Sequence, residues 1–480
     1  MAQPKKLKVL YVSPEVSPYV KSGGLADVAG SLPAALIKCG ADARVVFPKY
    51  RKISPEHLDG AEYIDSYTLT LGWRRQGASV HKLKTPVPTY TIENDYYFGR
   101  DGLYGYGDDY ERFGFFSKAV VEFMSYIDFR PDVVHLNDWQ TGITSVYLKD
   151  FYNKFYFYQG LKTLFTIHNL QYQGVFTKDS LASIDLPDWY YSSEKMEYYG
   201  TVNFMKTGVI YADAVSTVSP SYAWDIQTQG YGYGLDGIIR SKNDRLFGIL
   251  NGIDDHIYDP ATDKKVYENY SADALDRKKV NKEKLQAELG LNVCDAPLIG
   301  IVSRLADQKG MDLLAFCMEE LMHKDVQVVI LGTGEGRYEN LFRHYAWRYP
   351  QKCSANIYFS EDLAQKIYAG ADMFLMPSLF EPCGLGQLIA MRYGTVPVVR
   401  KTGGLNDTVR HYELGSRTGN GFLFQDYVAS GMMWAVNQAL GVYYNKDEWA
   451  NVVRNAMASD YSWDHSAARY IELYARLRDM

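Results

Sequence analysis

The chain has 480 residues, of which 47% are hydrophobic and 22% charged, and its formal net charge at pH 7 is −6. This length predicts two or three domains with sizeable cores. The acidic balance disfavours nucleic acid and anionic membranes as partners, because those surfaces attract basic proteins.

The five cysteines favour a cytoplasmic protein without a disulfide framework, since their number is odd and no CxxC pair occurs. The basic N-terminus is followed by an apolar run over only residues 9–12, which predicts a first strand rather than a signal peptide. No stretch approaches the roughly 18 apolar residues of a membrane span. We therefore expect a protein that acts in the cytoplasm.

Short β-branched runs alternate with helical stretches along most of the chain, which is typical of βαβ units and a largely parallel sheet. In the first half, strands are expected over residues 8–12, 43–47, 132–135, 163–167, 214–217 and 246–250. In the second half, they are expected over residues 298–302, 326–331, 357–359, 373–376 and 396–399. The pattern predicts an α/β protein whose ligands bind at the carboxyl ends of the strands.

The segment NGIDDHIYDP, residues 251–260, is rich in turn formers, and a charged stretch follows it. We therefore predict an N-terminal domain over residues 1–250, a second domain over 251–460 and a helical tail over 461–480. The tail has a periodic apolar stripe that would pack back on the first domain. The stripe comprises Ala467, Tyr470, Ile471, Tyr474 and Leu477.

A nearly repeated phrase stands near each end of the chain, KSGGLAD at residues 21–27 and KTGGLND at residues 401–407. A Gly-Gly turn before a helix leaves backbone N–H groups at the helix N-terminus, where the dipole favours an anion. Helices are expected over residues 25–38 and from residue 405. The phrases are either two helix starts that face an anion or a sugar, or ordinary glycine turns of an α/β fold.

Two strands of the first half end in polar clusters. HLNDW places His135, Asn137 and Asp138 at one end, and TIHN places His168 and Asn169 at the next. Neighbouring polar strand ends suggest a site. The alternative is that each histidine is a buried structural residue.

Two further loops in the second half combine charges with strand ends. SRLADQKG puts Arg304 and Lys309 after one strand, where two cations could clamp a diphosphate. FEPCGLGQ puts Glu381 just before a helix start, where a carboxylate could accept sugar hydroxyl protons. The alternatives are ordinary surface cations and a helix-capping carboxylate. Cys383 has no histidine near it in sequence, so we interpret it as a packing residue.

The chain lacks the motifs of metal and nucleotide cofactor sites. It has neither an HExxH pair nor a P-loop, and GTGEG at residues 332–336 is only part of a dinucleotide-binding loop. The 41 tyrosines are either a compositional bias or a feature of sugar binding, because a tyrosine combines a flat apolar face with a polar tip.

Six motifs in a fixed order together resemble one family. KSGGLADV, HLNDW, TIHNLQYQG, SRLADQKG, FEPCGLGQ and RKTGGLNDTV are similar to those of the bacterial glycogen synthases and plant starch synthases. The resemblance implies a GT-B fold, in which two Rossmann-like doubly wound domains face an interdomain cleft. It also implies transfer of glucose from ADP-glucose to the non-reducing end 4-OH of an α-1,4-glucan, with retention and without a metal or other cofactor.

The same resemblance assigns roles to individual residues. The implied catalytic residues are Lys21, Asp138, His168, Arg304, Lys309 and Glu381. The implied donor-binding residues are Gly23, Gly24, Asn169, Asn251, Phe359, Cys383, Gly384, Leu385, Thr402, Gly403 and Gly404. Tyr104 is implied on the acceptor side. Ile389 stands where many other retaining GT-B members have a second glutamate, which favours the glycogen and starch synthase branch.

Two alternatives stay open from the sequence. One is a related retaining GT-B transferase that uses UDP-glucose or another acceptor. The other is a non-catalytic glucan-binding homologue, although such a protein would be expected to have lost Lys21, Arg304, Lys309 and Glu381. The oligomeric state is not predicted.

Overall fold

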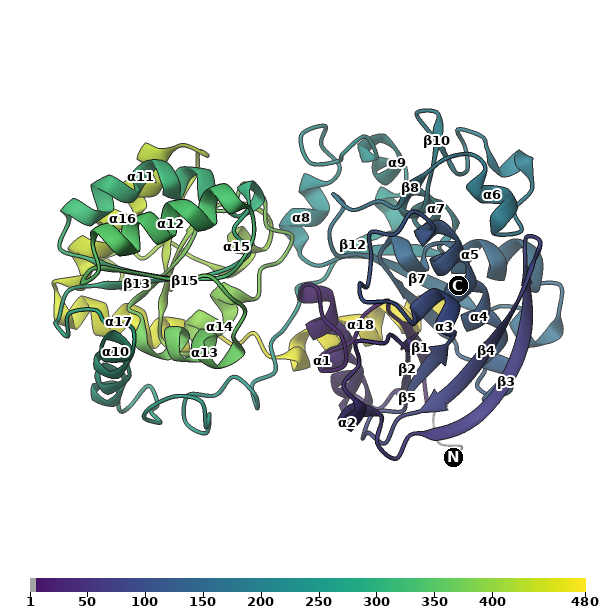
Figure 1. Cartoon of the computed structure of the whole chain (residues 1–480), viewed down its shortest axis with the longest axis horizontal. Coiled ribbons are helices and arrows are strands. Elements are labelled where there is room, and N and C mark those ends of the chain that lie inside the picture. The colour runs from purple at the N-terminus through teal and green to yellow at the C-terminus, as the bar shows by residue number, and fades with distance from the viewer. Residues whose placement is uncertain (1–5) are drawn as a thin grey trace. The chain divides into compact units, whose positions relative to one another are not determined.

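A computed structural model describes residues 6–480, which divide into two compact units (Figure 1). Unit 1 runs to Gly252 and takes up the chain again at Trp463, and unit 2 is Ile253–Ser462. Each unit is built on one main sheet with helices on both of its faces. The predicted α/β class is confirmed.

Unit 1 contains a nine-stranded sheet in the order β12-β11-β7-β6-β1-β2-β5-β4-β3. All neighbouring pairs are parallel except β3–β4 and β4–β5, which are antiparallel. The strands are β1 (Lys8–Val12), β2 (Asp42–Pro48), β3 (Glu62–Leu71), β4 (Arg74–Lys82), β5 (Thr89–Glu93), β6 (Val133–Asn137), β7 (Lys162–Ile167), β11 (Ala214–Thr217) and β12 (Leu246–Gly248). A second small sheet has the order β8-β10-β9, formed by β8 (Val175–Phe176), β9 (Glu197–Tyr198) and β10 (Thr201–Asn203).

The helices of unit 1 differ greatly in length. They are α1 (Gly24–Lys38), α2 (Pro55–Leu58), α3 (Asp95–Phe98), α4 (Asp109–Tyr126), α5 (Ile143–Val146), α6 (Ser180–Ser183), α7 (Phe204–Tyr211), α8 (Pro220–Asp225), α9 (Asp236–Arg240) and α18 (Trp463–Arg478). The central strands are buried nearly throughout, as is usual for parallel strands covered on both faces.

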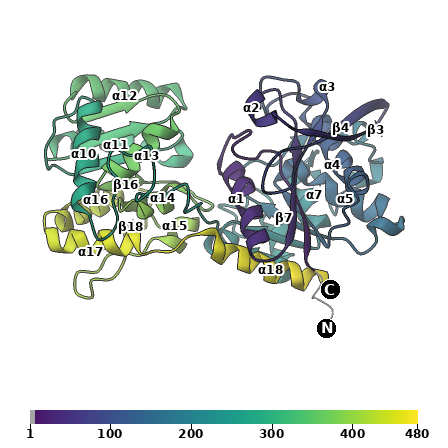
Figure 2. The same ribbon diagram turned by 90° about the horizontal axis from the view of Figure 1, so that it is seen from below.

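The C-terminal helix α18 belongs to unit 1, as the periodic stripe predicts. It lies beside α1 and contacts β6 (Figure 2). The Tyr474 hydroxyl lies 2.7 Å from His135 Nδ1, and Ser466 Oγ donates a 2.5 Å hydrogen bond to the Leu250 carbonyl. Of the predicted stripe, only Ile471 is not fully buried. The structure thus assigns His135 to the buried core, which is the structural alternative left open above.

Unit 2 contains a six-stranded, wholly parallel sheet in the order β15-β14-β13-β16-β17-β18. Counted within the unit this is 3-2-1-4-5-6, the dinucleotide-binding order of the Rossmann fold. The strands are β13 (Leu298–Val302), β14 (Gln327–Leu331), β15 (Cys353–Asn356), β16 (Met373–Met376), β17 (Val396–Arg400) and β18 (Phe422–Phe424). The helices are α10 (Asp276–Glu288), α11 (Met311–His323), α12 (Gly336–Arg348), α13 (Glu361–Gly370), α14 (Gly386–Arg392), α15 (Gly403–Thr408), α16 (Ala429–Tyr443) and α17 (Lys446–Met457).

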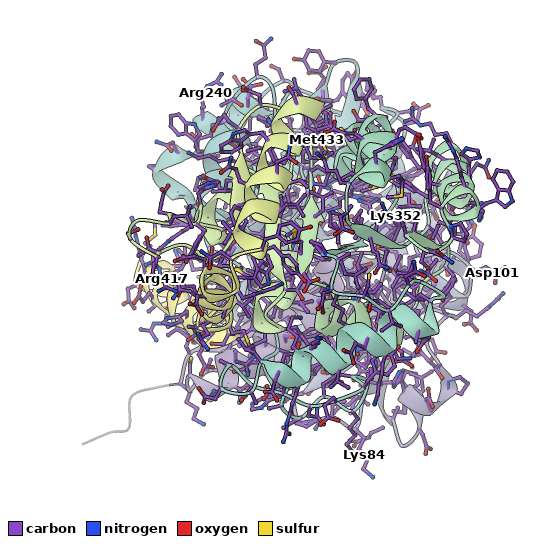
Figure 3. All side chains as sticks on the ribbon, turned by 90° about the vertical axis from the view of Figure 1, so that its left-hand side faces the viewer. Lys84, Asp101, Arg240, Lys352, Arg417 and Met433 are labelled. Atoms are coloured by element: carbon purple, nitrogen blue, oxygen red, sulfur yellow. The ribbon has the colours of Figure 1, made fainter. Side chains whose placement is uncertain are left out.

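Successive residues of the central strands of unit 2 enter different cores. Ile299 and Ile330 pack with residues of α11, α12 and α16, whereas Leu298 and Val329 pack with α10 and α13 on the other face. In Figure 3 the side chains fill the space between the sheet and its helices, and Met433, buried in the first of these cores, is labelled on α16. Because helices pack on both faces, the sheet is rigid, and the loops at the carboxyl ends of its strands can position a site.

Several predicted elements differ from the structure. The strand expected over 357–359 is wrong, because the edge strand is β15, formed by the more polar Cys353–Asn356. The strand expected over 246–250 ends at Gly248, and the helix expected from residue 405 begins at Gly403 and ends at Thr408. Sequence reasoning also missed the antiparallel edge β3–β4. Among the helices of residues 6–480, none has the length and apolar character to span a membrane.

Candidate functional site

In each main sheet the order of the parallel strands reverses at one point, and the polar motifs follow the strands there. In unit 1 the reversal falls between β1 and β6, and in unit 2 between β13 and β16. At such a point the loops leave in opposite directions and open a crevice at the carboxyl ends of the strands. The first glycine phrase follows β1, and Asp138 follows β6. Lys309 follows β13, and Glu381 follows β16.

In unit 1, the first glycine phrase is held by Glu15, a residue that sequence reasoning missed. Glu15 is 2% exposed, and its Oε2 accepts hydrogen bonds from Ser22 N at 2.9 Å and from Ser22 Oγ at 2.5 Å. The Gly23 amide also bonds to this carboxylate, and the Tyr104 hydroxyl lies 3.3 Å from Oε2. Burial raises the pKa of Glu15, and these hydrogen bonds offset part of that rise.

These contacts change what the first glycine turn can do. The amides of Ser22 and Gly23, at the start of α1, already bind a carboxylate of the protein itself. In this arrangement the Gly23 amide is bound to Glu15, and the predicted contact of Gly23 with the donor stays a prediction. The Lys21 ammonium instead points to Asp27 Oδ1 at 2.7 Å, with about a third of its side chain exposed. The sequence signal for Glu15 was its place directly after a buried strand.

Asp138 and His168 lie together at the ends of β6 and β7. Asp138 Oδ1 accepts a hydrogen bond from His168 N at 2.7 Å, and the Asn169 amide also bonds to this carboxylate. Burial raises the pKa of Asp138 to about 7, and the charge of Glu15 adds to this rise. The Asp138 backbone has φ 57° and ψ 178°, a conformation that is nearly restricted to glycine and that clusters at functional sites.

The His168 imidazole is neutral at physiological pH. Burial lowers its pKa to about 3, and its Nε2 lies 2.9 Å from Asn137 Oδ1. Since Asn137 Oδ1 can only accept, Nε2 carries the proton. A neutral ring that is already donating does not suit a general acid, so the backbone at His168 is the better candidate for a chemical role.

Asn169 and Asn251 complete the polar side chains of unit 1 that were predicted. The Asn169 side chain accepts a hydrogen bond from Gln171 N at 3.0 Å, which shapes the loop after β7. Asn251 is buried just beyond β12, and its Oδ1 has no hydrogen-bond partner among residues 6–480. A buried amide oxygen left in this state is costly, which marks Asn251 as a candidate ligand-binding group.

In unit 2, Lys309 and Glu381 form a nearly buried ion pair. Lys309 Nζ lies 2.6 Å from Glu381 Oε2, and the exposed fractions of the two side chains are 18% and 6%. Ser378 Oγ donates a second hydrogen bond to the same oxygen at 3.0 Å. The structure therefore brings together two residues from motifs 72 positions apart in sequence. Arg304 is exposed after β13, with Nη2 3.0 Å from Gln308 Oε1.

The second glycine phrase packs directly against the loop that carries Glu381. A Cβ atom added to Gly403 would lie 1.9 Å from the Glu381 carbonyl oxygen, and one added to Gly404 would lie 2.2 Å from the Cys383 carbonyl oxygen. The Gly404 amide donates a 3.0 Å hydrogen bond to the Glu381 carbonyl. This amide therefore holds the Glu381 backbone, and the predicted donor contact of Gly404 stays a prediction.

The remaining predicted residues of unit 2 surround this centre or lie apart from it. Thr402 is the buried N-cap of α15, and Cys383 is buried before α14, while Gly384 has a φ of 73° and Leu385 caps α14. Phe359 lies in the loop between β15 and α13 with 76% of its surface exposed. Two of the GTGEG glycines serve packing, since a Cβ on Gly332 would lie 1.8 Å from the Ser303 carbonyl oxygen and one on Gly334 would lie 2.2 Å from the Leu305 carbonyl oxygen.

Comparisons with known proteins agree with the motifs. Residues 8–241 match the family model described as the starch synthase catalytic domain, and residues 281–454 match that of glycosyl transferases group 1. In structure, the chain superposes on sucrose-phosphate synthase from Thermosynechococcus elongatus with a TM-score of 0.61 at 17% identity, covering 98% and 99% of the two chains. The fold and the polar strand ends thus define a glycosyltransferase of the GT-B class.

Closer relatives name the family. The glycogen synthases of Clostridium novyi and Clostridioides difficile are 48% and 49% identical, and each match covers 98% of this chain and at least 99% of the relative. The catalytic domain of starch synthase IV from Arabidopsis thaliana, solved with ADP and acarbose, has a TM-score of 0.93 at 32% identity and covers 99% of this chain and all of that one. The chain belongs to the glycogen synthase and starch synthase family, as its sequence motifs predict.

Proposed function

We propose that this protein transfers glucose from ADP-glucose to the 4-OH at the non-reducing end of an α-1,4-glucan, with retention of configuration. The observation that carries the proposal is the buried Lys309–Glu381 pair at the strand-order reversal of unit 2, together with 48% identity to a glycogen synthase over nearly the whole chain. The family supplies the substrates, and this pair supplies groups suited to them. Glycogen and maltooligosaccharides are the expected acceptors.

The charges suit a leaving group that becomes more negative as the reaction proceeds. When the bond between glucose and ADP breaks, negative charge grows on the diphosphate, and positive groups already in place stabilise it at little reorganisation cost. Lys309 is held by Glu381, and Arg304 offers a planar fork suited to phosphate oxygens. Lys21 adds a third cation from unit 1. We propose that these cations make a divalent metal unnecessary.

Glu381 has a second function in this proposal. Its buried carboxylate accepts hydrogen bonds from Lys309 and Ser378 through Oε2, so that Oε1 can accept from glucose hydroxyl groups. Asn251, with its buried unpartnered oxygen, and Asn169 are proposed to bind hydroxyl groups of the same sugar. The exposed Phe359 ring is proposed to stack on the nucleotide base, which supports ADP without excluding UDP.

Unit 1 is proposed to stabilise the sugar as it loses the diphosphate. Asp138 binds the His168 and Asn169 amides and so orients this backbone, whose His168 carbonyl can face the positive centre that develops on glucose. The acceptor 4-OH then attacks from the side that ADP leaves, and a departing phosphate oxygen takes its proton. Trapping a covalent glucosyl-enzyme would contradict this route.

A transfer assay tests the function. The protein is incubated with ADP-glucose labelled in the sugar, with UDP-glucose in parallel, and incorporation into glycogen is measured with and without EDTA. We expect incorporation from ADP-glucose that EDTA does not reduce, and an α-linked product by NMR. Loss of activity in EDTA would contradict the metal-free proposal, and faster transfer from UDP-glucose would contradict the donor. We propose that the enzyme acts in the cytoplasm, which suits five cysteines that form no disulfide within residues 6–480.

A further inference from the structure

Two Tyr-Gly turns in unit 1 adopt a backbone conformation that tyrosine normally avoids. In the hairpin that joins β9 to β10, Tyr199 has a φ of 47° and Gly200 a φ of 83°. In the loop before α9, Tyr233 has a φ of 47° and Gly234 a φ of 80°. Both turns lie in the part of unit 1 that Figure 1 labels β10 and α9.

Tyr199 adopts an unfavourable backbone conformation for a bulky residue, and its side chain adds little packing to the fold. Tyr198 pairs with Thr201, so the hairpin has a two-residue loop, and positive φ at both residues is what a type I′ turn requires. Asn-Gly is the preferred pair there, because asparagine tolerates this region and a bulky side chain does not. The Tyr199 ring is 81% exposed and buries little. A position that contradicts local preference in this way points to a function for the ring.

The two turns contact each other and gather further tyrosines. The Tyr198 hydroxyl donates a 2.6 Å hydrogen bond to the Tyr233 carbonyl, and a Cβ on Gly234 would lie 3.4 Å from the Tyr199 ring. Burial raises the pKa of Tyr233 to about 12, and its neighbours Tyr231 and Tyr172 add to this rise. We refer to Tyr172, Tyr198, Tyr199, Tyr231 and Tyr233 as the tyrosine patch.

The tyrosine patch is continuous with the loop that carries His168 and Asn169. Tyr172 N donates a 3.2 Å hydrogen bond to the Asn169 carbonyl. The side-chain Nε2 of Gln173 donates hydrogen bonds of 3.1 Å to the Leu170 and Tyr233 carbonyl oxygens. It therefore joins the loop to the second turn. A molecule that reaches from the chemical centre of unit 1 along this loop would therefore meet the patch.

We propose that the tyrosine patch binds the α-1,4-glucan acceptor at sugar residues beyond the one that reacts. The patch offers flat apolar ring faces for sugar C–H groups and phenolic hydroxyls for sugar hydroxyls. Its five side chains carry no formal charge at neutral pH, which suits a neutral polysaccharide. Exposed aromatic groups gathered in one area mark binding surfaces. This inference rests on the proposed function, because it takes the acceptor from there.

The variant Tyr199→Asn tests the patch without endangering the fold, because it creates the preferred Asn-Gly turn. Tyr199→Asn is made alone and in a double variant with Tyr172→Ala. Tyr172 is 49% exposed. Tyr199→Phe keeps the ring face and serves as the rescue. Tyr156→Asn is the matched control, since Tyr156 is 88% exposed elsewhere in unit 1.

Two measurements read the outcome. The retardation of each variant in native gels that contain glycogen reports binding, and the ratio of the KM for glycogen to the KM for maltose reports the use of distant sugar residues. We expect the double variant to lose retardation and to raise the KM ratio about tenfold, as the loss of ring stacking implies, and Tyr199→Phe to restore both. The control should behave as the unaltered protein, and melting temperatures should not fall for Tyr199→Asn.

The failures are distinguishable. If the unaltered protein transfers glucose from ADP-glucose but the double variant retains its glycogen retardation and KM ratio, the patch does not bind the acceptor. If the retardation is lost equally in Tyr156→Asn, binding is not specific to the patch, and the inference is overturned. If the unaltered protein transfers no glucose at all, the proposed function fails, whereas the gel still reports whether the patch binds glucan.

Discussion

The two glycine phrases have nearly the same sequence but are held by different forces. At residues 21–27 the turn amides bind the carboxylate side chain of Glu15, and the helix that follows has 15 residues. At residues 401–407 the turn fits sterically against the loop of Glu381, and the helix that follows has only 6 residues. The first turn therefore depends on a group that titrates, and the second on the absence of side chains.

The lysines of the two phrases differ as well. Both lysines are exposed, but the Lys21 ammonium is paired with Asp27 at 2.7 Å. In unit 2 the cation that we propose for the diphosphate is Lys309, which comes from another motif and is paired with Glu381. The shared sequence phrase thus indicates a shared backbone conformation, a glycine turn that leads into a helix. It does not indicate a shared chemical role.

Removal of Lys309 should have the largest effect. Lys309→Ala is expected to lower kcat/KM for ADP-glucose by about a thousandfold, because it removes a cation from the growing charge on the diphosphate. Lys401→Ala is the matched control in the second phrase and should change kcat/KM less than about twofold, as is usual for exposed side chains outside a site. Steady-state kinetics check both, and equal losses in the two variants would contradict the different roles of these lysines.

An alanine in each glycine turn should show whether the turn is held by steric fit or by hydrogen bonds to a carboxylate. Gly403→Ala places its Cβ against the Glu381 carbonyl oxygen and has a φ of 44°, so it should displace the Glu381 backbone. We expect about a hundredfold loss of kcat and a loss of about 2–4 kcal/mol in the free energy of unfolding. Gly23→Ala has extended backbone and no atom within 4 Å of the new Cβ, so its stability should change by less than about 0.5 kcal/mol.

Denaturant unfolding and kinetics on the same preparations check this pair. Equal tolerance of alanine at both positions would show that the second turn is not held by steric fit. A large loss of stability in Gly23→Ala would show that the first turn also depends on close packing.

The sequence predicted some strands of the fold better than others, depending on how apolar and buried their residues are. Strands β13 and β16 were predicted to the residue, because runs of buried apolar residues specify a parallel strand wherever it pairs. The antiparallel edge β3–β4 was missed, since its residues are largely polar and exposed. Phe359 was placed in a strand that its aromatic neighbours suggested, whereas pairing with β14 selects Cys353–Asn356.

The site shows the same limit. Motifs identified Lys309, Glu381, Asp138 and His168, because each stands next to a strand end that periodicity reveals. The hydrogen bonds of Glu15 to the first turn and of Gly404 to Glu381 join loops from different motifs, so no single motif contains them. Sequence therefore predicts which residues reach the edge of a sheet, and tertiary packing decides which amides remain available there.

The titration of Asp138 should make unit 1 sensitive to pH. Its folded-state pKa is raised from 3.8 to about 7, so the folded protein binds the proton more tightly than the unfolded chain. Stability should therefore fall as pH rises from about 4 to 7 and then level off, relative to Asp138→Asn. Activity should do the opposite, falling about tenfold from pH 8 to pH 6, because a protonated carboxyl holds the His168 and Asn169 amides less well.

A pH series of melting temperatures and of kcat/KM checks both signs. In Asp138→Asn the activity should be lower and the midpoint near pH 7 should disappear. A midpoint that persists in this variant would assign the titration to another group.

Glu15→Gln should have the smallest effect, and it tests the support of the first turn most directly. The amide keeps the shape of the carboxylate but loses its charge, so its bonds to Ser22 and Gly23 weaken while the desolvation cost of the buried charge disappears. We expect stability to be unchanged or slightly higher and kcat/KM for ADP-glucose to fall about fivefold as the turn and Lys21 lose their fixed position. Glu361→Gln, on an exposed carboxylate of unit 2, is the control. An unchanged kcat/KM in Glu15→Gln would mean that the Gly-Gly turn keeps its geometry without the carboxylate, and the two phrases would then differ in packing alone.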